Sequence, residues 1–190
     1  MKKKKEEPLP QIEGYEPEQR TISMLAANIW AVVVMVVAGG VGWWLIKWIH
    51  PDAALAAVDM LWFIAMFCVG IVVHELIHGL TWIALVKESF SHLSFGTMPG
   101  GVYCHIDVPM SKRKYVVGAL MPGLLTGVVP WLAGIAAGSL LWTLLGAVMI
   151  GAAMGDIMIV WCIRKETPDT LVYDHPSLGG CYVYRKIDIQ

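Results

Sequence analysis

Four long apolar runs separated by short polar segments constrain this 190-residue chain more than any other feature. The runs cover residues 23–48, 54–86, 115–137 and 139–163, and each is long enough for a helix to cross a lipid bilayer. Hydrophobic residues make up 57% of the chain and charged residues only 15%, a balance that argues against an ordinary soluble domain. The sequence therefore predicts an all-α polytopic membrane protein with about four transmembrane helices, forming a single domain over residues 21–163.

One small β-structure is predicted between the second and third apolar runs. The polar loop at residues 87–114 contains strand-like runs at 92–98 and 102–108. Between them lies Pro99-Gly100-Gly101, a sequence typical of a tight turn. The loop is therefore predicted to form a small β-hairpin.

Two polar segments flank the apolar domain. Residues 1–20 carry a lysine run and three prolines, and we interpret them as a flexible tail. Residues 164–190 form a second polar tail, in which residues 171–173 and 181–184 are candidate short strands.

The distribution of basic residues predicts the orientation in the membrane. With four spans, both tails and the loop at residues 87–114 lie on the same side, and only Lys47 of the 14 Lys and Arg residues lies on the other. Lys and Arg concentrate on the cytosolic side of membrane proteins. We therefore expect a multi-pass cell-membrane protein, in contact with the lipid bilayer, with both termini and the hairpin in the cytosol. Because topology accounts for the basic residues, we expect no nucleic-acid partner.

A metal-binding motif, His74-Glu75-Leu76-Ile77-His78, lies deep in the second apolar run. On a helix, positions i and i+4 share a face, so His74 and His78 can present two imidazoles to one ion. Glu75 lies about 100° around the helix from His74, within reach of a water molecule at that ion. Zinc peptidases use this arrangement, with the carboxylate accepting a proton from water. Three ionisable residues so close together in a membrane span require such a reason.

A third zinc ligand should lie at the same depth as the two histidines. His78 lies about 13 Å along the helix from Lys87, and Asp156 lies about 12 Å from Arg164 at the same predicted membrane face. Asp156 is the acidic residue deep in the last two apolar runs, and metal ligation would offset the cost of burying its carboxylate. The hairpin residues that remain as alternative ligands are Cys104, His105 and Asp107.

These motifs resemble those of a known class of enzymes. The HELIH helix, the hairpin, the Pro- and Gly-rich third run and the downstream Asp156 are similar to the site-2-protease class of intramembrane zinc metalloproteases. The Gly155-Asp156 pair and the tail sequences Asp174-His175-Pro176 and Tyr182-Val183-Tyr184 resemble more closely a membrane family described as zincin peptidases. The resemblance implies a Zn²⁺-dependent metalloendopeptidase with ligands His74, His78 and Asp156 and with Glu75 as general base.

We therefore expect a peptidase that hydrolyses membrane-associated protein or peptide substrates near the cytosolic face. A substrate would have to be extended, and a strand edge of the hairpin could pair with it. Two other interpretations remain open at this stage. One is a catalytically silent membrane scaffold of the same fold, and the other is a protein that handles metal ions or protons through His74, Glu75, His78 and Asp156. The sequence indicates neither a particular substrate nor an oligomeric state.

Overall fold

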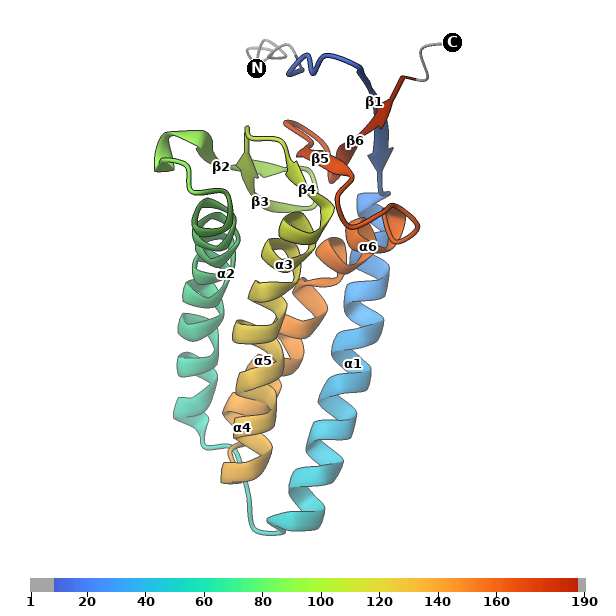
Figure 1. Ribbon diagram of the computed structural model, residues 1–190. Coiled ribbons are helices and arrows are strands. Elements are labelled where there is room, and N and C mark those ends of the chain that lie inside the picture. Colours follow the sequence, from blue (N-terminus) through green and yellow to red (C-terminus); the bar gives the residue numbers. More distant parts are fainter. Residues whose placement is uncertain (1–8, 188–190) are drawn as a thin grey trace.

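Four long apolar helical stretches run side by side in the computed structural model, which describes residues 9–187 (Figure 1). Residues 1–8 of the predicted flexible tail, which include the lysine run, lie outside this range. The first and second stretches are single helices, and the third and fourth are each divided into shorter segments. In chain order the segments are α1 (Met24–Ile49), α2 (Ala57–Val86), α3 (Lys112–Pro122), η2 (Gly123–Val128), α4 (Val129–Ala137), α5 (Leu140–Ala152) and α6 (Met154–Cys162).

All four stretches are long and apolar enough to cross a membrane. Their outer faces carry large apolar side chains that no other part of the fold covers, such as Leu25, Trp48 and Leu61, each at least 70% exposed. Apolar faces of this size are costly to expose to water and are accommodated by the hydrocarbon core of a bilayer. The fold thus fits a multi-pass membrane protein, as the sequence predicted, while the orientation of the termini stays a prediction.

The third stretch changes its helical winding in the middle. Pro130 has no backbone N–H to offer the carbonyl of Thr126, and its ring crowds that carbonyl. Residues Gly123–Val128 adopt a π-helical winding there, and the helix continues without a break from Lys112 to Ala137. The stretch ends at Gly138, whose φ of +69° is favourable for glycine, and Ser139 then caps α5 by accepting from the Trp142 backbone N–H.

Glycines allow the first helix to approach its neighbours. A side chain at Gly42 would overlap Trp131 and Thr143, so α1 can pack tightly against α4 and α5 only because this position has none. Gly40 has open space around it and makes no such approach.

A four-stranded antiparallel sheet joins both ends of the chain above the helices (Figure 1). Its strands, in spatial order, are β1 (Tyr15–Thr21), β6 (Gly180–Lys186), β5 (Leu171–Asp174) and β4 (Met110–Ser111). The prediction of an all-α fold with one hairpin was therefore wrong in this part. The segments interpreted as two tails pair directly, with Tyr15 opposite Lys186 and Thr21 opposite Gly180.

The predicted hairpin is confirmed as a separate two-stranded sheet. The one-turn helix η1 (Phe90–His92) leads into β2 (Leu93–Met98), which pairs with β3 (Gly101–Ile106). The turn between them contains Gly100 with a φ of +97°, a conformation that glycine adopts without strain.

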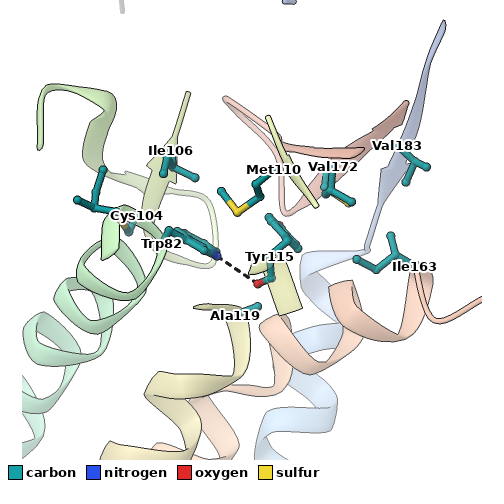
Figure 2. Packing of buried hydrophobic residues seen from close by; sticks show 11 residues of the cluster. Trp82, Cys104, Ile106, Met110, Tyr115, Ala119, Ile163, Val172 and Val183 are labelled. Atoms are coloured by element: carbon teal, nitrogen blue, oxygen red, sulfur yellow. Dashed lines mark hydrogen bonds between the residues drawn. The ribbon is translucent and has the colours of Figure 1, made fainter. Parts of the chain in front are cut away.

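A buried apolar cluster connects the hairpin, the four-stranded sheet and the upper ends of the helices (Figure 2). It includes side chains from β3, β4, β5, β6 and α3, so the strands pack on the helices as one body. Its fully buried members include Ile106, Tyr115, Ile163, Val172 and Val183.

Candidate metal centre

Two imidazoles and one carboxylate converge between α2 and α6. His74 and His78 lie one turn apart on α2 and are only 5% and 4% exposed. Their Nε2 atoms lie 3.2 Å and 3.4 Å from Asp156 Oδ2 and Oδ1, respectively. Asp156 reaches them from the first turn of α6, directly after the break at Ala153. The structure thus brings together three of the residues that the sequence selected.

The outer nitrogen of each imidazole faces a hydrogen-bond acceptor. His78 Nδ1 lies 2.9 Å from the Gly118 carbonyl oxygen, which can only accept, so Nδ1 carries a proton. His74 Nδ1 lies 3.4 Å from Thr126 Oγ1, and the Thr126 hydroxyl itself donates to the Pro122 carbonyl. The threonine oxygen therefore accepts from His74. A neutral ring with its proton on Nδ1 presents the lone pair of Nε2 toward Asp156.

This donor set fits a metal ion. Two ring nitrogens and a carboxylate point at one another, an arrangement that is stabilised either by a proton on each Nε2 or by a cation among the three groups. Two neutral imidazoles and one carboxylate also match the ligands that Zn²⁺ takes in catalytic sites. The hydrogen bonds of the outer nitrogens orient metal-binding imidazoles in the same way. His74 and His78, with Asp156 or Glu75 as the carboxylate, are therefore the residues that could hold zinc.

Glu75, the residue next to His74, lies beside the two imidazoles and takes no part in their contact with Asp156. Its ligand atom and those of His74 and His78 lie within 4.8 Å of one another. The Cys104 backbone N–H of β3 faces the Glu75 carboxylate. Glu75 is thus held at the edge of the cluster by the hairpin, where it could exchange a proton with water.

A cavity of about 370 Å³ opens next to the cluster. Its walls include His74, Glu75, His78 and Asp156, and the tip of the hairpin and the Leu178–Gly180 turn cover it. Asn28 of α1 donates to the Gly100 carbonyl at 3.4 Å and ties the hairpin tip over the cavity. A ligand in the cavity would therefore contact the metal centre, α1 and the hairpin at once.

The hairpin residues considered as alternative ligands have other partners. His105 Nδ1 lies 3.0 Å from Asp174 Oδ2, and Asp107 Oδ1 lies 2.7 Å from His92 Nδ1. The Cys104 thiol packs against Gly79, and burial raises its pKa to about 12, so it is a neutral thiol at physiological pH. The structure brings none of these three side chains between the two imidazoles of α2.

Gly155, which precedes Asp156, does not serve a close approach of a neighbouring backbone, because nothing lies within 4 Å of the position of an added Cβ. The break before α6, and not a close helix crossing, places the carboxylate.

Sequence reasoning missed the residues that orient the imidazoles. Thr126 reaches His74 from the π-helical segment, which no sequence pattern marks in advance. Trp82 stacks on His78 with ring centroids 5.1 Å apart. Trp82 lies at i+4 from His78, and the spacing that linked the two histidines could therefore have identified it. A side chain at Gly118 would overlap the Trp82 ring, so this glycine provides both a carbonyl for His78 and space for Trp82.

Comparison with known proteins was made on the whole chain. A family model described as "Putative zincin peptidase" matches residues 67–171. The matched region begins just before the HELIH motif and includes Asp156. No curated protein and no solved structure matches the chain.

Proposed function

We propose that this chain, which belongs to the zincin peptidase family, is a zinc-dependent endopeptidase that cleaves membrane-associated proteins within the bilayer, near its cytosolic face. Membership of the family indicates a metallopeptidase. One observation carries the finer proposal: His74, His78 and Asp156 converge inside two helical stretches that are apolar enough to cross a membrane. A metal site in such a position serves substrates that reach it from the membrane.

The chain's own residues divide the catalytic work. His74, His78 and Asp156 would hold the ion, and Thr126 and Gly118 fix the ring orientations. When bound, Zn²⁺ supplies a Lewis acid that activates water and polarises the scissile carbonyl. Asp156 would add one negative charge to the ligand set.

Glu75 is the general base in this proposal. Its carboxylate accepts a proton from the attacking water while the water oxygen bonds to the carbonyl carbon. It then passes that proton to the amide nitrogen as the C–N bond breaks, so that the products are a carboxylic acid and an amine, which ionise to a carboxylate and an ammonium group. Asn28 and backbone N–H groups along the cavity are the available donors for the oxyanion.

The free edge of β3 supports an extended substrate. β3 pairs with β2 on one side only, and the Cys104 N–H on its other side points at Glu75. Val102 and Cys104 line the cavity on this edge. A substrate strand paired there would take the Cys104 N–H and release the Glu75 carboxylate for proton transfer.

Zinc removal tests the proposed function. The full-length chain, reconstituted in lipid vesicles with a mixture of membrane-anchored peptides, is expected to cleave peptides next to their apolar segments. Cleavage should stop when a chelator removes zinc and return when Zn²⁺ is added, with products identified by mass spectrometry. A peptide hydroxamate, which binds catalytic zinc, provides a measurement that does not depend on the substrate chosen. Metal-independent cleavage, or neither cleavage nor zinc-dependent hydroxamate binding, would contradict the proposal.

A further inference from the structure

Three rings stack in series from the metal centre toward the strands. The His78 and Trp82 ring centroids are 5.1 Å apart with an interplanar angle of 19°, and Trp82 and Tyr115 are 5.5 Å apart at 17°. The Trp82 indole N–H also donates to the Tyr115 carbonyl oxygen at 3.1 Å (Figure 2). Trp82 is therefore held on one face and at its nitrogen by Tyr115, and its other face supports His78.

A carboxylate of strand β5 fixes the far end of this stack. The Tyr115 hydroxyl donates to Asp174 Oδ1 at 2.8 Å, and His105 Nδ1 lies 3.0 Å from Oδ2. Tyr115 is 1% exposed and Asp174 is 8% exposed. A buried carboxylate is costly unless its partners are in place, so Asp174 favours one position of the phenol ring. Asp174 lies outside the region that the family model matches.

The stacked rings restrict the tilt of the His78 imidazole, which its hydrogen bond to Gly118 alone does not prevent. The single bond from Nδ1 to the Gly118 carbonyl allows the imidazole to pivot about that contact. The flat face of Trp82 opposes the pivot, because tilting the ring would force the two aromatic faces to overlap. A ligand ring that is held in one plane binds metal more tightly than one that is free to tilt.

We propose that Asp174 and Tyr115 are positioning residues for His78 and act through Trp82, so that the docking of strand β5 completes the metal centre. The inference rests on the proposed function, because it requires His78 to be a metal ligand. It assigns a role in metal binding to strand β5, of which only Leu171 lies within the matched region.

The test compares two phenol groups in the same part of the fold. Tyr115→Phe removes the hydroxyl that bonds Asp174, whereas the matched control Tyr184→Phe removes a hydroxyl that bonds the Pro10 carbonyl and contacts no member of the stack. Full-length proteins in detergent are titrated with Zn²⁺ alone, and the visible spectrum of the Co²⁺-substituted forms is recorded. Tyr115→Phe and Asp174→Asn are expected to bind zinc about tenfold more weakly and to shift the cobalt bands. Tyr184→Phe should match the wild type in both measurements.

The possible results separate this inference from the proposed function. If the wild type binds zinc and cleaves peptides but Tyr115→Phe matches Tyr184→Phe, the inference fails and the proposed function stands. If the wild type binds no zinc, both fail. Trp82→Phe keeps a ring against His78 and loses the indole N–H, so it tests the same path even if Asp174→Asn does not fold. Unchanged zinc affinity and cobalt bands in that variant would also overturn the inference.

Discussion

Replacing Glu75 with glutamine is expected to lower the rate of peptide hydrolysis by about 10²–10⁴-fold, the usual contribution of a general base. Glutamine has nearly the same shape as glutamate and can still meet the Cys104 N–H, but its amide cannot take a proton from water. Because Asp156 is the carboxylate that lies within 3.4 Å of both Nε2 atoms, the variant should keep its zinc. Hydrolysis and zinc content are measured on the same preparation.

Glu88→Gln is the matched control, since Glu88 lies at the base of the hairpin, is exposed, and does not line the cavity. It should hydrolyse peptides at the wild-type rate. Hydrolysis by Glu75→Gln within about threefold of the wild-type rate would exclude Glu75 as the base. Loss of zinc in Glu75→Gln would show instead that Glu75 is a ligand, as the short distances to both imidazoles allow.

Gly118→Ala is expected to have the largest effect of any single methyl group added near the site. The new Cβ would overlap the Trp82 ring, and Trp82 cannot easily move because it is 4% exposed, stacked on both faces and hydrogen-bonded. Overpacking of this kind costs about 1–3 kcal/mol. The movement of Trp82 should also release His78. We therefore expect a lower melting temperature together with weaker zinc binding.

Gly40→Ala is the control for Gly118→Ala, because it also adds a methyl group inside a long helix but has open space around it. Thermal unfolding of both variants in the same detergent, with and without added zinc, separates packing from metal binding. A Gly118→Ala protein with the melting temperature and zinc affinity of Gly40→Ala would mean that Trp82 moves aside without cost.

The helical part of the fold and the centre of the site could be predicted from local patterns. Apolar runs specify membrane helices because lipid leaves few other ways to satisfy the backbone. The i, i+4 spacing placed His74 and His78 on one face, and counting residues from the helix ends brought Asp156 to their depth. The structure has Asp156 within 3.4 Å of both rings.

The strands predicted at residues 171–173 and 181–184 are confirmed as β5 and β6, but β1 and the pairing that joins the two ends of the chain could not be predicted in the same way. β1 contains Pro17 and several charged residues and has no apolar alternation, because it is an edge strand whose stability comes from pairing with β6. β4 has only two residues. Long-range pairing of this kind leaves little local signal. The contacts that depend on it, including those of Asp174 with Tyr115 and His105, were therefore also missed.

The most direct test of the central claim is the zinc content of the Asp156→Ala protein. Full-length wild type, purified in detergent and analysed by mass spectrometry of its metals, is expected to contain about one zinc ion per chain. Asp107→Ala, which removes an exposed hairpin carboxylate, should contain as much. The account predicts that Asp156→Ala loses most of its zinc, as His74→Ala should. Full zinc content in Asp156→Ala would contradict the metal centre described here.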